Sequence, residues 1–206
     1  MTKLFEEKKF NIPKLEGISE KTIGEHIKLY SGYVKNTNTI LTKIDEYVVD
    51  SENNAYALGE LQRRFAFEFD GMRNHEYYFS HLENGPTVIT QEFSVYKAVE
   101  EEWGDFDKWL NRFKAIALTR GIGWAILYYD SHTKRLVNTW VDEHHLGQLV
   151  GLSPLLVLDM WEHAYFIDYT PAEKKKYVEA FFANLNWQNV EENFLSAQAV
   201  SNATQK

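Results

Sequence analysis

The first part of the chain has the hydrophobic periodicity of a long helix. Ser19 is a suitable N-cap, and Glu20 follows it in the first turn, where an acidic side chain is favourable. From there to about Asp50, apolar and aromatic residues return every three or four positions, as one helix face requires. They are Ile23, Ile27, Tyr30, Val34, Leu41, Ile44 and Val48. The pattern predicts one helix of this length.

Breaks on both sides of this stretch indicate a helical hairpin. Residues 1–17 read as an extended arm, because Pro13 and Gly17 interrupt it. Residues 51–54 are polar and predict a loop, and residues 55 to about 83 predict a second helix or a broken helix. Asn84-Gly85-Pro86 then reads as a linker.

The remaining residues alternate between helical and strand patterns. Helices are expected over residues 92–102, 106–119 and from Pro171 to Phe182. Short runs rich in β-branched and aromatic residues predict strands at 124–130, 135–141 and 155–158. The tail after Ala197 is small and polar, and we expect it to be frayed.

These elements predict an α+β fold in two parts. A long-helix hairpin domain is expected over residues 1–86. An α+β domain with a three-stranded antiparallel sheet is expected over residues 87–206. The length of 206 residues provides ample core for such an arrangement.

Composition and charge limit the classes of partner. The net charge of −8 disfavours sequence-independent binding of nucleic acid, which depends on many Lys and Arg contacts to phosphate. No apolar run approaches the roughly 20 residues of a membrane span, so no membrane partner is expected. An anionic substrate would need local basic groups to guide it against the overall charge.

The chain contains no cysteine. Disulfides, thiolate metal sites, iron–sulfur clusters and a cysteine nucleophile are therefore excluded. The first nine residues lack the apolar core of a secretory signal. We therefore expect a cytoplasmic protein.

Candidate metal chemistry is concentrated around one acid and one histidine. Asp159 follows a buried strand and His163 lies four residues later, so a carboxylate and an imidazole can converge on one cation. Such a donor set suits iron, manganese or zinc. The pair alone is a weak signal. H-E-x-x-H, Glu-x-x-His, phosphate-binding and nucleophile-elbow motifs are all absent from the sequence.

The surrounding residues resemble a known family. The segment Asp159-Met160-Trp161-Glu162-His163-Ala164-Tyr165 resembles the D-x-W-E-H-A-[YF] signature of iron/manganese superoxide dismutases. Further segments match that family in the same order along most of the chain. They are residues 73–79 (RNHEYYF), 103–107 (WGDFD), 123–125 (GWA), 151–156 (GLSPLL) and 185–190 (LNWQNV).

The resemblance implies a reaction, a cofactor and a ligand set. The reaction would convert two superoxide ions to dioxygen and hydrogen peroxide at one iron or manganese ion per chain, with a bound water or hydroxide as fifth ligand. The protein ligands would be His26, His75, Asp159 and His163. The resemblance does not decide between iron and manganese.

The first ligand has a competitor. The family usually places a tyrosine eight residues after this histidine, and Tyr33 lies only seven after His26. Counting back eight gives Glu25. We prefer His26, because Glu25 would leave two carboxylates and only two imidazoles. Seven residues also make nearly two helical turns, so Tyr33 can still share a face with His26.

Other residues around the metal are implied by the same resemblance. Tyr33 would control access and relay protons, and Trp124 and Trp161 would form an apolar wall. His144 would hold the bound solvent in place of the usual glutamine, with His145 and Glu143 as competitors. The positions implied to lie behind these groups are Tyr30, Gly71 and Val157.

The family also suggests an assembly. Glu162 would reach His163 of the partner subunit in a homodimer, and a tetramer stays open. Tyr30 and Phe166 stand where the family often has a His–Tyr pair across the dimer. Lys28, Lys35 and Arg73 are candidates for guiding superoxide, although each is equally explained as a solvated charge.

Two other functions compete with the enzyme. One is a catalytically inactive relative that serves as a structural subunit of a larger assembly, such as a ribosome. The retention of four ligand positions disfavours it. The other is a mononuclear metal hydrolase or oxygenase, which the long matched frame disfavours.

Overall fold

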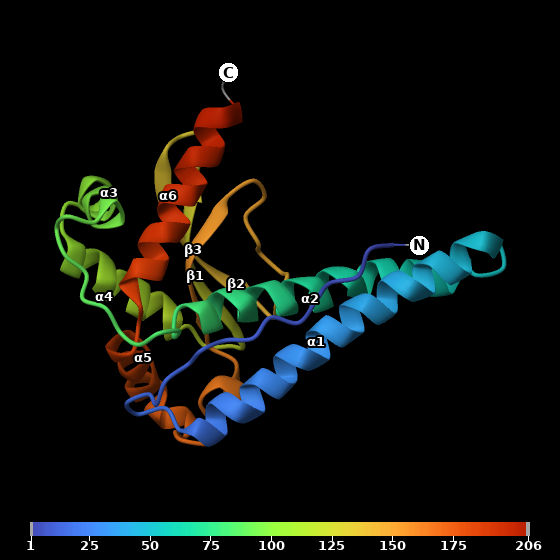
Figure 1. Cartoon of the computed structure of the whole chain (residues 1–206), viewed down its shortest axis with the longest axis horizontal. Coiled ribbons are helices and arrows are strands. Elements are labelled where there is room, and N and C mark those ends of the chain that lie inside the picture. The colour runs from blue at the N-terminus through green and yellow to red at the C-terminus, as the bar shows by residue number, and fades with distance from the viewer. Residues whose placement is uncertain (1, 205–206) are drawn as a thin grey trace.

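The computed structural model describes residues 2–204. Two long helices come first, α1 (Glu20–Tyr47) and α2 (Ala55–Ser80), with a short 3₁₀ turn at Val48–Asp50 between them. They pack side by side as an antiparallel hairpin whose tip projects away from the rest of the molecule (Figure 1). Ser19 caps α1 as predicted, because its side chain accepts a hydrogen bond from the backbone N–H of Thr22.

The second part of the chain contains a small sheet and four helices. The helices are α3 (Ser94–Trp103), α4 (Phe106–Ala117), α5 (Lys174–Ala183) and α6 (Trp187–Thr204). The strands are β1 (Gly123–Asp130), β2 (Arg135–Asp142) and β3 (Ser153–Asp159), and short 3₁₀ turns lie at Glu162–Ala164 and Pro171–Glu173. The predicted α+β class and the antiparallel three-stranded sheet are therefore confirmed.

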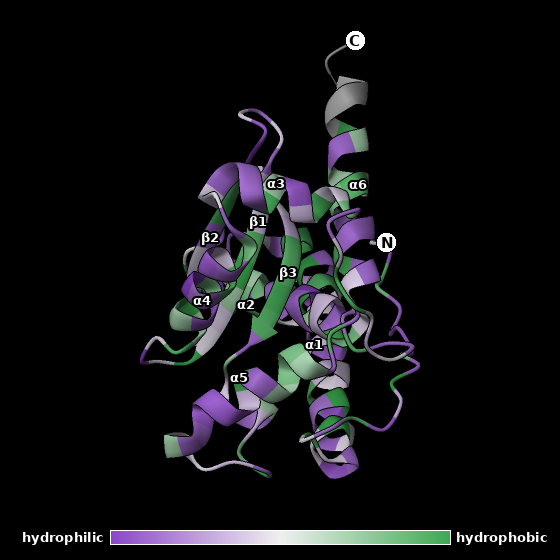
Figure 2. Cartoon of the chain, turned by 90° about the vertical axis from the view of Figure 1, so that its left-hand side faces the viewer, coloured by the Kyte–Doolittle hydropathy of each residue, from purple (hydrophilic) through white to green (hydrophobic). Residues whose placement is uncertain are grey.

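The sheet places two candidate site residues beside each other. Its strand order is β2-β1-β3, so β1 lies in the middle, and seven of its eight residues are buried. In this register Trp124 pairs with Asp159. In Figure 2 the hydrophobic strands lie between layers of helices, and α2 and α6 both pack against β3.

One hydrophobic core runs through both parts of the chain. It contains Tyr30 and Val34 from α1, Phe79 from α2 and the buried strand residues. The two parts are also joined by hydrogen bonds, because the carboxylate of Asp168 accepts from the backbone N–H of Ser19 and the hydroxyl of Thr22. A domain boundary after residue 86 stays a prediction.

The C-terminal segment is more helical than expected. Helix α6 continues beyond Ala197 to Thr204, and residues 205–206 of the predicted tail lie outside the described residues. Val190, Phe194 and Ala197 bury one face of α6, and Glu191 accepts hydrogen bonds from the first backbone N–H groups of α3. This anchoring, with good helix formers such as Gln198 and Ala199 beyond it, explains why the helix continues. None of the helices in residues 2–204 has the length and apolar character needed to cross a bilayer.

Candidate metal centre

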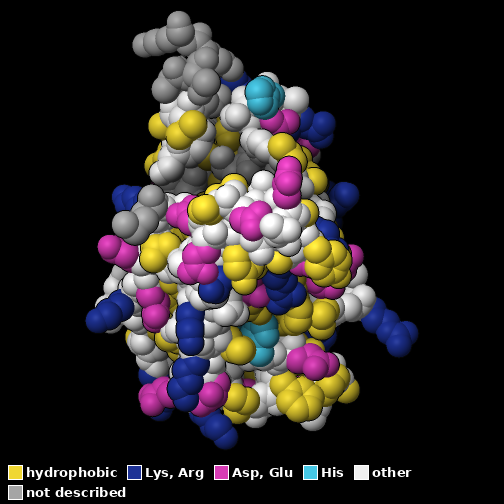
Figure 3. All heavy atoms as spheres, turned by 90° about the vertical axis from the view of Figure 1, so that its right-hand side faces the viewer, with side chains coloured by type: hydrophobic (Ala, Val, Ile, Leu, Met, Phe, Trp, Pro, Cys, Tyr) yellow, Lys and Arg dark blue, Asp and Glu magenta, His cyan; other side chains and the backbone are white. Residues whose placement is uncertain are grey.

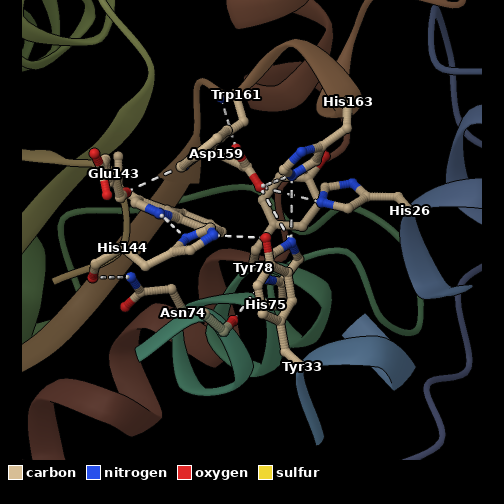
Figure 4. Close-up of polar contacts among 12 residues, drawn as sticks. His26, Tyr33, Asn74, His75, Tyr78, Glu143, His144, Asp159, Trp161 and His163 are labelled. Carbon is tan, nitrogen blue, oxygen red and sulfur yellow. Dashed lines mark hydrogen bonds and ion pairs between the residues drawn. The ribbon is translucent and has the colours of Figure 1, made fainter. Parts of the chain in front are cut away.

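Four side chains from four elements converge at the junction between the hairpin and the sheet (Figure 4). His26 comes from α1, His75 from α2, Asp159 from the end of β3 and His163 from the 3₁₀ turn that follows. One nitrogen or oxygen of each residue lies within 4.8 Å of the corresponding atoms of the others. Three of the four residues are fully buried, and the His163 side chain is 19% exposed.

The distances between these donor atoms fit one shared ion. Asp159 Oδ2 lies 3.1 Å from His26 Nε2, 3.5 Å from His75 Nε2 and 3.2 Å from His163 Nε2. The Nε2 atoms of His75 and His163 are 3.4 Å apart. Donors bound roughly 2.1 Å from one metal at angles of 90–120° are separated by about 3.0–3.6 Å. The chemistry and the spacing of the set therefore both fit one transition-metal ion.

The protonation of the histidines favours metal binding. His75 Nδ1 donates to the backbone oxygen of Gly71 at 2.6 Å, which leaves the lone pair of Nε2 directed at the other three groups. Burial lowers the pKa of His26 and holds the pKa of His75 well below its usual range, so both rings are neutral. Burial alone would raise the pKa of Asp159, but His163 and His26 together bring it below its ordinary value, so this residue is a carboxylate.

Local structure directs Asp159 and His163 toward the same point. The backbone N–H of Trp161 donates to Asp159 Oδ1 at 2.8 Å, which turns the chain immediately after β3 and leaves Oδ2 for the cluster. The 3₁₀ turn Glu162–Ala164 then brings His163 back over the carboxylate. A short sequence motif can therefore supply two converging groups.

Tyr33 and His144 form a polar pair beside the four groups. The Tyr33 hydroxyl lies 2.7 Å from His144 Nε2, and the Tyr33 ring stacks on His75 with ring centres 5.1 Å apart. Trp124 Nε1 donates to His144 Nδ1 at 3.1 Å. These contacts place both predicted polar residues next to the candidate ligands.

The competitors of His144 lie elsewhere. His145 is only partly buried and packs against the edge of Phe67, with ring centres 5.6 Å apart. Glu143 is partly buried, and its backbone oxygen accepts a hydrogen bond from Trp161 Nε1 at 3.1 Å. Of these three neighbours, His144 therefore reaches furthest into the site.

Gly71 is required by the close approach of Tyr33. A Cβ atom at position 71 would lie only 2.7 Å from Cδ1 of the Tyr33 ring. Without a side chain there, Tyr33 can lie flat against His75. Gly71 thus has two effects on the site, through this space and through its hydrogen bond to His75.

Two tryptophans enclose the cluster. Trp161 stacks on His144 and on His163, with ring centres 4.6 Å and 5.7 Å apart and nearly parallel planes. Trp124 is fully buried and meets His75 edge-on at 5.0 Å. Both rings therefore lie directly against candidate ligands.

Two of the residues predicted to surround the metal have other contacts. The Tyr30 hydroxyl accepts from the backbone N–H of Lys8 and donates to Glu76, so it ties the N-terminal arm to α2. The backbone N–H of Val157 donates to His81 Nε2 at 3.1 Å. Val157 is fully buried, in line with ordinary strand packing.

Tyr78 and Tyr177 also belong to this region and were missed in the sequence. The Tyr78 ring lies 5.0 Å from the His26 ring, and the Tyr177 hydroxyl donates to the backbone oxygen of Asp159 at 2.9 Å. The two hydroxyls are 3.2 Å apart. Tyr78 was visible only as part of a matched segment, and Tyr177 has no local signal because its contact spans 18 residues.

Comparisons with known proteins agree with this geometry. The sequence profile of "Iron/manganese superoxide dismutases, C-terminal domain" matches residues 90–193. A protein of Aquifex aeolicus named "Superoxide dismutase [Fe]" is 38% identical over 188 residues, which cover 89% of this chain and 87% of that protein.

Further relatives, one named for iron and one for manganese, are almost as similar. A "Superoxide dismutase [Fe]" of Cupriavidus metallidurans is 35% identical, covering 89% of this chain and 92% of the relative. A "Superoxide dismutase [Mn]" of Mycolicibacterium fortuitum is 34% identical, covering 86% and 84% respectively.

Proposed function

The chain belongs to the iron/manganese superoxide dismutase family, and from this membership we infer that it converts two superoxide ions to dioxygen and hydrogen peroxide. It is thus an oxidoreductase. One superoxide loses an electron and becomes dioxygen. The other gains that electron and two protons and becomes hydrogen peroxide.

The convergence of three imidazoles and one carboxylate is the observation that best supports this function. We propose His26, His75, Asp159 and His163 as the ligands of one iron or manganese ion per chain. Such an ion supplies the alternation between the +3 and +2 states that stores the electron between the two half-reactions. Asp159 adds a negative charge, which favours the higher state. A catalytically inactive structural subunit would not need these four groups together, so that alternative is not favoured.

We propose that Tyr33 and His144 handle the protons. His144 is neutral, because burial lowers its pKa to about 3. Its Nδ1 accepts from Trp124, so Nε2 carries the hydrogen and donates it to the Tyr33 oxygen. The hydroxyl hydrogen of Tyr33 is then free to be donated to the peroxide that forms beside it. Trp124 and Trp161 keep competing water out.

The choice of metal is part of the proposal. Relatives of similar identity carry iron or manganese in their names, and imidazole and carboxylate donors accept either ion. Metal analysis of the purified protein, followed by superoxide assays after separate loading with iron and manganese, tests it. Activity with one or both ions is expected, whereas a loaded protein without activity would contradict the function.

We also propose a homodimer. Glu162 is exposed beside His163, and Phe166 and Ile167 are 58% and 43% exposed on the same short segment. An acidic group next to exposed apolar side chains suits a contact in which Glu162 reaches His163 of the partner subunit. Light scattering of the wild type and of Glu162→Ala tests this. A dimer that dissociates in the variant is expected, a tetramer would extend the proposal, and a monomeric active wild type would refute it.

A cytoplasmic location is the last part of the proposal. The cysteine-free sequence needs no oxidising compartment to fold. Cell fractionation followed by activity staining tests it, with activity expected in the cytosolic fraction. Activity confined to a membrane or secreted fraction would contradict it.

A further inference from the structure

Phe67 connects the site to an arginine on the surface. Its ring lies 4.6 Å from the His144 ring and 6.2 Å from the Tyr33 ring, between ring centres. Three aromatic neighbours of Phe67 are only partly buried and so reach solvent here. They are Tyr33, His145 and Trp161. The guanidinium carbon of Arg64 lies 3.7 Å from the centre of the Phe67 ring. A positive charge therefore covers the aromatic rim of the site.

Arg64 is held in this place by its own helix. Its side chain is 55% exposed and forms an i,i+4 ion pair with Glu68 at 2.7 Å, while Nε donates to the same carboxylate at 2.8 Å. Glu68 is only 4% exposed and also accepts from Asn36 of α1. The Arg64 guanidinium is thus exposed to solvent, while the Glu68 carboxylate that it pairs with is buried.

The field of this pair reaches the polar residues of the site. Arg64 lowers the pKa of Tyr33 against the larger, raising effect of burial, and it lowers the pKa of His144 in the same direction as the larger effect of burial. Glu68 opposes it at Tyr33, where it raises the pKa. Arg64 and Glu68 therefore have opposite electrostatic effects on the Tyr33 hydroxyl.

The other basic candidates have different surroundings. Lys28 pairs with Glu25 at 2.7 Å on the exposed face of α1. Arg73 pairs with Glu76, which Lys8 also contacts beside the N-terminal arm. On the side of the molecule seen in Figure 3, basic and acidic side chains alternate without a broad basic patch. On this side of the acidic protein, guidance of an anion would therefore depend on single, well-placed cations.

We propose that Arg64, stacked on Phe67, guides superoxide into the site and that the buried carboxylate of Glu68 moderates this attraction. The proposal rests on the proposed function, since superoxide is the anion concerned. Phe67 keeps the guanidinium over the rim, and Glu68 fixes its orientation and lowers its net field. Removing the charge of Arg64 should therefore lower the rate constant for superoxide, and removing the charge of Glu68 should raise it.

The test compares four variants of the metal-loaded protein, three that each remove one charge and Arg64→Lys, which keeps the charge. Arg64→Gln and Glu68→Gln each remove one charge of the pair. Arg63→Gln is the matched control, because Arg63 is the next residue along, is 77% exposed and pairs with Glu60 instead. The second-order rate constant for superoxide is measured between low and high ionic strength, and azide affinity is measured by optical titration as a second anion probe.

A single unit charge about 8 Å from an incoming anion changes its local concentration roughly two- to threefold in water. Arg64→Gln should therefore lower the rate constant and the azide affinity about two- to threefold at low salt, and both effects should fade at high salt. Glu68→Gln should raise both quantities. Arg64→Lys should recover most of the rate, because it restores the charge.

The outcomes separate this proposal from the proposed function. An inactive wild type would overturn the function itself. An active wild type in which Arg64→Gln behaves like Arg63→Gln would overturn the role of Arg64 alone. A loss of rate in Arg64→Gln that persists at high salt, or that Arg64→Lys does not rescue, would show a packing role and would also overturn it. Thermal melts confirm that each variant is folded.

Discussion

The Tyr33 hydroxyl lies 2.7 Å from His144 Nε2, and the protonation of His144 fixes the direction of this hydrogen bond. Trp124 Nε1 is a donor only, so the nitrogen it faces, His144 Nδ1, must be an acceptor. The neutral ring then carries its hydrogen on Nε2 and donates it to Tyr33. The geometry leaves Tyr33 as the member of the pair that can donate a proton outward.

This arrangement predicts how His144 substitutions behave. His144→Ala leaves the hydroxyl of Tyr33 and the indole N–H of Trp124 without their partner. Loss of such a group beside a metal site typically costs about 10- to 100-fold in activity or metal affinity. We expect a fall of this size in superoxide turnover, measured by pulse radiolysis with the metal content determined in parallel.

Two further variants separate the role of His144 from general damage. His144→Gln keeps one donor and one acceptor and should recover part of the activity. His145→Ala should be nearly neutral, because His145 lies at the rim against Phe67. Equal losses in His144→Ala and His145→Ala would contradict the assignment.

His26 and Glu25 give a second prediction. His26 is fully buried with Nε2 3.1 Å from Asp159, whereas Glu25 is half exposed and pairs with Lys28. His26→Ala should lose most of its bound metal, while Glu25→Ala should keep the wild-type content because it breaks only a surface ion pair. Mass spectrometry of the purified variants measures their metal content and so decides between His26 and Glu25 as the ligand. Full retention in His26→Ala would remove His26 from the ligand set.

The helices and strands were predictable where their periodicity was strong. The run from Ile23 to Val48 carries the signal of α1, and the β-branched and aromatic residues of 124–130 carry that of β1. The helix α6 was not predicted, although Val190, Phe194 and Ala197 are spaced by four and three residues, as one helix face requires. Its contacts with α3 and β3 involve distant parts of the chain, which local patterns do not contain.

Some residues of the candidate site were also predictable from the sequence, and others were not. Asp159 and His163 lie four residues apart, so one segment indicates both. His26 was preferred to Glu25 on donor chemistry, and α1 is a continuous α-helix across the seven residues to Tyr33. Tyr177 and Arg64 had no signal, because their roles depend on which distant side chain lies beside them. The ligand roles themselves stay predictions until a metal is measured.

Tyr177 and Tyr78 give a third prediction. Tyr177 donates to the buried backbone oxygen of Asp159, so Tyr177→Phe leaves that oxygen without this donor. A buried acceptor left unsatisfied costs about 1–3 kcal/mol in the free energy of unfolding. Tyr78→Phe is the matched control, because it removes a neighbouring buried hydroxyl but keeps the hydrogen bond to Asp159.

Urea denaturation and metal content are measured for both tyrosine variants. Tyr177→Phe should be the less stable of the two and should also retain less metal, because the peptide that carries the Asp159 carboxylate is less firmly held. If Tyr78→Phe were equally damaging to metal content, the hydrogen bond to Asp159 would not be the cause.

Asp70 on α2 gives a prediction about pH. Burial raises the pKa of this carboxyl group to about 6, against roughly 3.9 in an unfolded chain. The folded state therefore favours the protonated form. The associated stability is fully present below about pH 4 and is lost as the pH rises through 6. Above that range the folded protein carries a carboxylate in a poorly hydrated place.

Asp70→Asn removes this ionisation while keeping nearly the same shape. The variant should therefore be more stable than the wild type at pH 7.5, by about 1 kcal/mol once screening of this partly exposed group is allowed for. The gap should shrink at pH 4.5, because the Asp70 carboxyl of the folded wild type is then largely protonated and most of the cost of its buried charge is gone. Urea denaturation of the metal-loaded proteins at the two pH values measures it, with Glu101→Gln as a control because Glu101 is exposed on α3. A gap of the same size at both pH values would show that the amide stabilises α2 by some means other than the ionisation of Asp70.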